Sequence, residues 1–136
     1  MLTLAIVKPD AVASGKAGRI IAHLEEQGFK VKAMRMVKLS QAQAQKFYEV
    51  HKERPFYGSL VTFMTSGACI PMALEADQPV AKLRAAIGAT DPKEAAAGTV
   101  RALFAESKER NAIHASDSDE NARREVGFFF TEAELA

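Results

Sequence analysis

The stretch Leu2-Thr3-Leu4-Ala5-Ile6-Val7 is apolar at every position except Thr3. A short apolar run of this kind is typical of a central strand that is covered on both faces of a sheet. Pro9 ends the strand, because proline has no N–H to donate to the ladder. Lys8 is left at the carboxyl end of the strand, where layered α/β proteins often carry functional groups. Taken alone, Lys8 also fits a solvated lysine at a strand end.

The residues that follow alternate between helix and strand patterns. Apolar residues at helical spacing predict a helix over 17–27 that ends at Gly28, and Phe29, Val31 and Ala33 then alternate with lysines as in a strand. Ser40 and Gln43 have the spacing of a capping box for a second helix, which we expect to reach about Val50. The segment 54–58 breaks that helix and displays two aromatic residues.

The second half of the chain continues the alternation. An apolar strand is predicted over 69–74, where Pro71 demands a bulge or an edge position. Asp77 is expected to cap a third helix that Gly88 ends, and 89–98 is expected to be a loop with one short helical piece. A helix over about 119–126 and a final apolar strand over 127–130 complete the pattern. The order of elements predicts a small α/β sandwich, a single domain over 1–136.

Composition excludes several classes of protein. The 136 residues are 48% hydrophobic and 26% charged, which is ordinary for a globular domain, and the net charge of +1 argues against a nucleic-acid or membrane-surface protein. Cys69 is the only cysteine, so no internal disulfide forms and a reducing compartment is expected. The chain meets Lys8 and Pro9 too early for a signal peptide, and no apolar run is long enough to span a bilayer. We therefore expect a cytoplasmic protein.

A lone histidine stands in the most informative stretch of the second half. His114 follows the apolar pair Ala112-Ile113 and precedes the polar run Ser116-Asp117-Ser118, which reads as the entry to a helix. The N-terminus of a helix favours anions such as phosphate. The stretch therefore suits a histidine that handles phosphoryl groups, although a structural histidine beside a helix cap fits the same window.

Several blocks of sequence resemble the nucleoside diphosphate kinase family. The blocks, in chain order, are Ile6–Asp10, Phe47-Tyr48 with His51, Arg54–Tyr57, Thr65–Gly67, Gly88–Pro92, Gly98–Arg101, Asn111–Ser118 and Arg124-Glu125. The resemblance implies a ferredoxin-like fold, a four-stranded antiparallel sheet with a βαββαβ core covered by helices. It also implies an enzyme that moves the γ-phosphoryl group of a nucleoside triphosphate, usually ATP, to a nucleoside diphosphate through a phosphohistidine.

The resemblance implies a catalytic role for five residues. His114 stands at the position of the nucleophile, and Glu125 at that of the carboxylate that orients it. Placing Glu125 in the last turn of its helix, where the dipole disfavours an anion, supports a functional role, but pairing with Arg123 and Arg124 in solvent is the alternative. Ser116, Tyr48 and Lys8 match the remaining positions, with helix capping for Ser116 and core packing for Tyr48 as competing roles.

The nucleotide-binding residues are likewise implied by the resemblance: Lys8, Phe56, Leu60, Arg84, Thr90, Arg101 and Asn111. Cations and polar groups among them match phosphate and ribose contacts, and Phe56 matches the aromatic residue on which the base stacks. No acidic cluster suggests a dedicated metal site, so Mg²⁺ is expected to arrive on the nucleotide phosphates. Stacking tolerates any base, so broad base and sugar specificity is expected.

The resemblance further implies a homo-oligomer. Members of the family assemble from a common dimer, and because few residues follow Leu135, a tetramer or loose hexamer is expected here. The chain departs from the family pattern at Ala68, Ala76 and Pro71, and at Ala115, where glycine is usual. Ala115 is harmless unless that position needs a positive φ.

One other class of function competes with the enzyme. A nucleotide-sensing or scaffold protein can keep such a pocket without turnover, because a fold alone does not define a function. Against that alternative, a mere binder does not need both His114 and Glu125. Nucleic-acid binding has no support, since this nearly neutral chain has no basic stripe.

Overall fold

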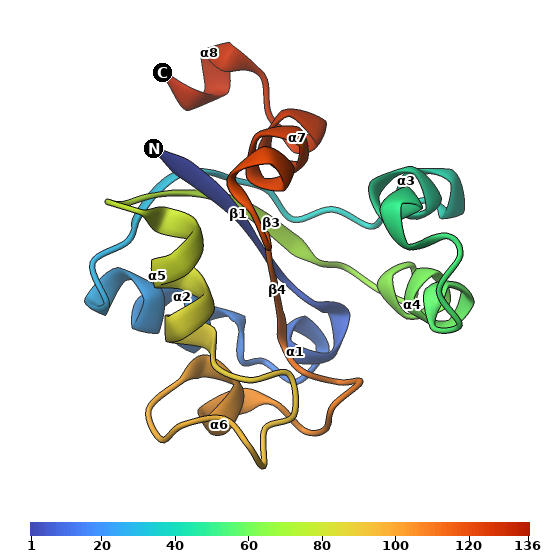
Figure 1. The fold of residues 1–136 in the computed structure, drawn as a ribbon, viewed down its shortest axis with the longest axis horizontal. Helices are drawn as coiled ribbons and strands as arrows, with labels where there is room; N and C mark the ends of the chain where they lie inside the picture. Colours follow the sequence, from blue (N-terminus) through green and yellow to red (C-terminus); the bar gives the residue numbers. More distant parts are fainter.

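A four-stranded antiparallel sheet in the order β2-β3-β1-β4 forms the centre of the molecule, which the computed structural model describes over residues 1–136 (Figure 1). β1 (Leu2–Val7) pairs with β3 (Ile70–Glu75) on one side and with β4 (Ile113–Ala115) on the other. β2 (Lys30–Met34) lies at the outer side of β3. The antiparallel order confirms the expected ferredoxin-like sandwich.

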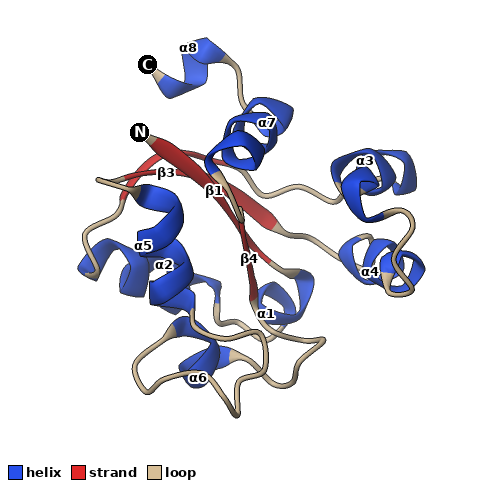
Figure 2. Ribbon diagram, viewed as in Figure 1, coloured by secondary structure: helices blue, strands red, loops and turns tan.

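Helices cover both faces of this sheet (Figure 2). They are α1 (Pro9–Ala13), α2 (Ala17–Glu26), α3 (Gln41–Phe47), the 3₁₀ helix η1 (Glu49–His51), α4 (Tyr57–Met64), α5 (Pro79–Ile87), α6 (Val100–Phe104), α7 (Asp119–Phe129) and α8 (Glu132–Leu135). α2 and α5 lie on one face, and α7 lies on the other, with the α3–α4 hairpin beside it.

The core is divided by the sheet into two apolar clusters, and β1 contributes to both. Ala5 and Val7 join the cluster that includes Leu24 and Leu83 from α2 and α5. Leu4 and Ile6 join the cluster under α3, α4 and α7. Successive residues of a strand point to opposite faces, so an apolar strand without alternation must be covered on both. The prediction of a central first strand is confirmed.

Local signals in the sequence set several helix ends as expected. Ser40 and Gln43 form the predicted capping box at the start of α3. Gly88 ends α5 with a φ of +85°, a conformation that glycine adopts without a steric penalty. α3 is shorter than predicted, since it stops at Phe47 and η1 follows before Val50 is passed.

The predicted strand over 127–130 is wrong, because α7 continues to Phe129. Val126 and Phe129 lie three residues apart on the buried face, whereas Gly127 is exposed, which is a helical and not a strand pattern. The cap predicted at Asp77 is also wrong: Gln78, with a φ of +46°, precedes Pro79 at the first position of α5.

Four short helices escaped the sequence patterns. α1, α4 and α8 were not predicted, and the helical piece expected within 89–98 lies just after it, as α6. Each has at most eight residues, too few for a clear periodicity.

Pro71 lies in β3, between β1 and β2, so the edge position expected for it is wrong. No bulge occurs at Pro71 itself; the irregularity is in β2, between Val31 and Ala33. The carbonyl oxygen of Pro71 accepts from the N–H of Arg35, one residue beyond the end of β2. The missing N–H of Pro71 faces the same side, so the pairing has one hydrogen bond fewer at this point, and it continues two residues further on at the Val37–Cys69 bridge.

Candidate active site

His114 is held at the middle of β4, opposite Ile6 of β1. Its side chain therefore points to the face of the sheet that α3 and α7 cover, and its ring lies edge-on to the ring of Phe47, with 5.5 Å between centroids. The side chain is 18% exposed, so one part of the ring remains open to solvent. Because β4 is paired only with β1, His114 lies at an edge of the sheet.

A tight turn just before β4 aims this histidine. Ala112 has a φ of +75°, and the N–H of Ile113 donates to the carbonyl of Asn111 at 2.9 Å, which makes a strained γ-turn. The turn is fixed from the end of β1, because the N–H of Ala112 donates to Asp10 Oδ2 at 3.0 Å and its carbonyl accepts from the N–H of Lys8 at 2.8 Å. Strain of this kind persists only where the surroundings impose it.

The substitution at Ala115 has no backbone consequence. Ala115 lies in β4, pairs with Ala5, and is not among the residues with a positive φ. The residue with the unusual backbone is Ala112, three positions earlier.

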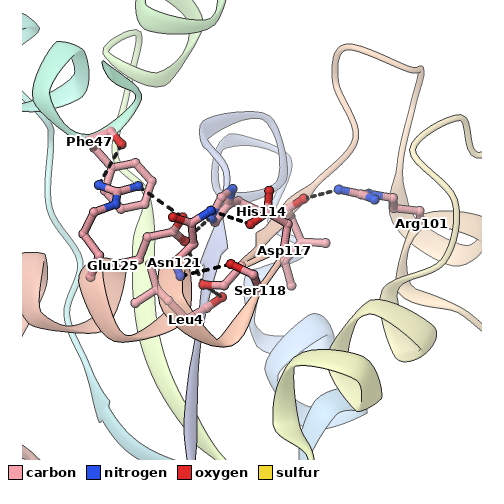
Figure 3. Close-up of polar contacts among 11 residues, drawn as sticks. Leu4, Phe47, Arg101, His114, Asp117, Ser118, Asn121 and Glu125 are labelled. Carbon is pink, nitrogen blue, oxygen red and sulfur yellow. Dashed lines mark hydrogen bonds and ion pairs between the residues drawn. The ribbon is translucent and has the colours of Figure 1, made fainter. Parts of the chain in front are cut away.

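Glu125 on α7 binds His114 directly (Figure 3). Its Oε1 lies 2.7 Å from Nε2 of His114 and accepts a second hydrogen bond from Oγ of Ser116 at 2.8 Å. Ser116 is fully buried, and its role here is to bind Glu125, whereas the cap of α7 is Ser118. Glu125 does pair with Arg124, as the alternative supposed, but not in solvent, because the side chain of Glu125 is only 7% exposed.

The electrostatics of this pair determine the tautomer of His114. Burial raises the pKa of Glu125, but the hydrogen bond and charge of His114, together with Ser116 and Arg124, outweigh it, and the pKa ends below its ordinary value. An ionised carboxylate can only accept, so Nε2 of His114 carries the hydrogen and Nδ1 keeps a free lone pair. The argument from the helix dipole is wrong, because α7 continues to Phe129, a full turn beyond Glu125.

Tyr48 closes the site from the end of α3. Its ring is 6.0 Å from that of His114 and nearly perpendicular to it, and its hydroxyl is buried without a hydrogen-bond partner. Burial and the charge of Glu125 raise the pKa of the phenol, so it is a neutral donor. Tyr48 belongs to the core and also lies against the histidine, so both roles proposed for it are compatible.

Two buried cations lie near the turn at Ala112. Nζ of Lys8 donates to Oδ1 of Asn111 at 2.9 Å, and Arg101 donates to the carbonyls of Gly88 and Ile113 at 3.1 and 2.8 Å. Burial and the charge of Arg101 lower the pKa of Lys8 to about 8, against the opposing effect of Asp10. Burial and the charge of Arg84 lower the pKa of Arg101 to about 10. Neither cation has a carboxylate within ion-pair distance, so the region is short of negative charge.

The remaining predicted residues are not buried: Arg84, Thr90 and Phe56 are exposed, and Leu60 is half-buried. Arg84 is in the last turn of α5, close enough to Arg101 to affect its pKa, and Thr90 is in the loop after α5, without a hydrogen bond to the other site residues. Phe56 begins the hairpin helix α4 and is 48% exposed, with the ring of His51 at 5.6 Å. Leu60 is one turn further along α4.

Buried polar residues are concentrated here. Of the eight in the chain, five were predicted as site residues: Lys8, Arg101, Asn111, Ser116 and Glu125. A buried polar group is costly unless it is satisfied, so such a concentration indicates a built site. Asp10 is a sixth, and its role was missed, because its partner Ala112 is 102 residues away and no local pattern links them.

Comparison with known proteins agrees with this geometry. The family model for nucleoside diphosphate kinase matches residues 2–135. The nucleoside diphosphate kinase of Desulfatibacillum aliphaticivorans is 56% identical over 134 residues, covering 98% of this chain and 97% of the relative, and that of a Nitratiruptor species is 56% identical over 133 residues, covering 98% and 97%. A crystal structure of the Aquifex aeolicus nucleoside diphosphate kinase superposes with a TM-score of 0.97 at 43% identity, covering 99% of this chain and 98% of that one.

Fold and site together define a nucleotide-binding phosphotransferase built on a ferredoxin-like sandwich. The chain belongs to the nucleoside diphosphate kinase family. It is an enzyme that transfers the γ-phosphoryl group of a nucleoside triphosphate to a nucleoside diphosphate, by the ping-pong mechanism that is general to the family. No helix in the structure combines the length and apolarity needed to cross a bilayer.

Proposed function

We propose that Nδ1 of His114 is the atom that accepts the phosphoryl group, with Glu125 and Ser116 as the residues that hold the ring. The observation that carries this proposal is the bond of 2.7 Å between Nε2 and Glu125 Oε1, which leaves Nδ1 unprotonated. As the N–P bond forms, positive charge develops on the ring, and the carboxylate stabilises it. The residue roles proposed here rest on this geometry together with family membership.

The two half-reactions balance on the same atom. Nδ1 attacks the γ-phosphorus of the triphosphate while the bond to the β-bridging oxygen breaks and the diphosphate leaves. A terminal oxygen of a second diphosphate then attacks the phosphohistidine, the N–P bond breaks, and the lone pair returns to Nδ1. Nε2 keeps its proton throughout both steps, because the N–H donates a hydrogen bond to the carboxylate of Glu125.

Arg84, Thr90 and Arg101 are proposed to contact the phosphates, and Lys8 and Asn111 to reach the ribose hydroxyls and the bridging oxygens of the polyphosphate. The support is the lowered pKa of two of these cations, Lys8 and Arg101, since a polyphosphate supplies the negative charge that this region lacks. No group of three or more His, Cys, Asp or Glu side chains is arranged to hold a metal ion. Mg²⁺ is proposed to arrive bound to the nucleotide phosphates, where it neutralises their charge.

Nucleotide binding is expected to be accompanied by proton uptake near pH 9. Lys8, with a pKa of about 8, is mostly neutral there in the free enzyme, and a bound polyphosphate raises its pKa, so up to about one proton is taken up. Calorimetric titration with ADP in two buffers of different ionisation enthalpy measures the uptake. Lys8→Met is the control and is expected to take up none. Equal proton uptake by the variant, or none by the wild type, contradicts the role of Lys8.

The specificity of the enzyme is proposed to be broad, because Phe56 offers an exposed ring face at the tip of the α3–α4 hairpin. Stacking contributes about 1–3 kcal/mol for any base, whereas discrimination of about 10⁴-fold needs hydrogen bonds to base edges.

Protein mixed with γ-labelled ATP is expected to hold acid-labile, base-stable label. ADP, GDP, CDP and dTDP should each remove the label, with second-order rates within about a hundredfold of one another. An unlabelled protein contradicts the mechanism, and a larger preference contradicts the broad specificity.

The protein is proposed to be a homo-oligomer built from dimers. β2 is an edge strand with one side unpaired, and Met34 and Met36 beside it are 48% and 63% exposed. Unpaired strand edges and exposed apolar side chains favour association. Sedimentation at micromolar concentration is expected to give a tetramer or a hexamer. A stable monomer contradicts the proposal.

A further inference from the structure

Arg124 is the one charged residue that contacts the His114–Glu125 pair and has no role in the mechanism above. Its Nη2 lies 3.5 Å from Oε2 of Glu125, the carboxylate oxygen that His114 does not use. Its Nη1 donates to the carbonyl oxygen of Phe47 at 3.3 Å, and its Cζ lies 5.7 Å from the centroid of the Phe47 ring. The side chain is 35% exposed, so about two thirds of it is covered.

The carbonyl that Arg124 binds belongs to the last residue of α3. The final carbonyls of a helix have no partner within the helix, and a cationic side chain placed there satisfies one of them and complements the helix dipole. Arg124 therefore caps α3 from a different helix, α7, 77 residues along the chain. Without this contact, the C-terminal end of α3 loses a hydrogen bond that connects it to α7.

The same guanidinium thus touches both supports of the imidazole. Glu125 fixes the ring of His114 through Nε2, and Phe47 packs against its edge at 5.5 Å. Phe47 is fully buried in the cluster under α7, where it also contacts Phe129. The planar guanidinium has two terminal nitrogens, so it contacts Glu125 and the carbonyl of Phe47 at the same time. The single nitrogen of a lysine ammonium group cannot do so in the same geometry.

The cap on α3 extends this effect to the nucleotide base. α4 is tied to α3, because the hydroxyl of Tyr57 donates to the carbonyl of Gln45 at 3.2 Å. Phe56, proposed above as the base platform, immediately precedes α4. Fixing the end of α3 therefore fixes the position of Phe56 relative to His114, which transfer of a phosphoryl group requires.

We propose that Arg124 is a positioning residue that holds Glu125 against His114 and, by capping α3, sets the distance between the reacting histidine and the base platform. The inference rests on the proposed function of His114. The sequence offers a matched comparison, since Arg123 is adjacent and basic but exposed, without a hydrogen bond or ion pair to the site.

Removing the charge of Arg124 is expected to shift the acid limb of the pH–rate profile in one direction. The titratable groups that face Glu125 are His114, Arg124 and the phenol of Tyr48. The charge of Arg124 is one of the causes that lower the pKa of Glu125, so its loss raises that pKa. The ionised carboxylate that orients His114 is then lost at a higher pH, and the acid limb of the pH–rate profile moves to higher pH.

The test compares Arg124→Gln, Arg124→Lys and Arg123→Gln in the full chain, with pH profiles of phosphoenzyme formation from ATP, kcat and KM. Arg124→Gln is expected to lower kcat by about 10- to 100-fold and to move the acid limb upward. Arg124→Lys, which keeps the charge without the fork, is expected to restore the acid limb but only part of kcat. Arg123→Gln is expected to stay within about twofold of the wild type.

Each other result overturns the proposal. An Arg124→Gln variant that matches Arg123→Gln removes any role for Arg124, and a loss of kcat with an unchanged acid limb reduces it to a structural cap. If Arg124→Gln does not fold, as judged by its thermal melt, Arg124→Lys decides, because wild-type kcat in that variant excludes the role of the fork. A wild-type protein that forms no phosphoenzyme instead contradicts the function of His114, which separates the two failures.

Discussion

His114→Ala is expected to lower kcat by at least about 10⁴-fold, because removal of the nucleophile of a covalent mechanism leaves only the catalysis due to binding and electrostatics. Binding of nucleotide should change little. The phosphate-binding cations are held by other groups, Lys8 by Asn111 and Arg101 by two backbone carbonyls, and none of these bonds involves the imidazole. Steady-state kinetics and calorimetric binding of ADP measure the two effects separately.

His23→Gln is the matched control for this loss, since His23 lies on α2, on the opposite face of the sheet. Its kcat should remain within about twofold of the wild type, as for a substitution outside the site. A His114→Ala variant with more than a tenth of wild-type kcat is incompatible with a phosphohistidine at that residue.

Glu125→Gln is expected to lower kcat by about 10²- to 10⁴-fold, the range found when a group that orients a catalytic histidine is neutralised. One oxygen of Glu125 accepts from both His114 and Ser116, and the other faces a guanidinium nitrogen of Arg124 at 3.5 Å. An amide cannot satisfy both sides: either its NH₂ group faces Arg124, or it faces the two donors. Glu125→Gln also removes the ionisable group itself, so the part of the acid limb that reports protonation of Glu125 is expected to disappear from the pH–rate profile.

Arg124→Gln, by contrast, is expected to keep this limb and to move it to higher pH, so the two variants check each other. Urea unfolding gives a second measurement. The lowered pKa of Glu125 means that its ionised form stabilises the folded state above the ordinary pKa of about 4.5, and that this contribution disappears as the pH falls through the lower folded value. Glu125→Gln should therefore weaken the acid dependence of stability. Wild-type kcat in this variant contradicts the orienting role.

Much of the fold could be predicted because its signals are local. The apolar run of β1, the capping box of α3 and the terminating Gly88 each depend on a few neighbouring residues. The errors came where tertiary context decides. The aromatic run at the end of α7 is compatible with a strand in isolation, and Pro71 lies in a central strand although it has no N–H to donate to the neighbouring chain.

The candidate site divides in the same way. The candidate site residues follow from the resemblance, and five of them are buried, with hydrogen bonds that link Lys8 to Asn111, Arg101 to Ile113 and Ser116 to Glu125. Their supports could not be predicted, since Asp10 reaches Ala112 and Arg124 reaches Phe47 across 102 and 77 residues. In the sequence, Asp10 is an acidic residue at the start of a helix and Arg124 is one of two adjacent arginines. Only the folded chain distinguishes them from solvated charges.

The central claim concerns a single atom, Nδ1 of His114, and the phosphoenzyme tests it most directly. Protein labelled from ATP is denatured in base, digested to single amino acids, and its phosphohistidine is compared by ³¹P NMR and chromatography with the two synthetic isomers. The bond between Nε2 and Glu125 predicts one phosphohistidine per chain, phosphorylated on Nδ1 and absent from His114→Ala. Phosphate on Nε2, on another residue, or on the His114→Ala variant would contradict it.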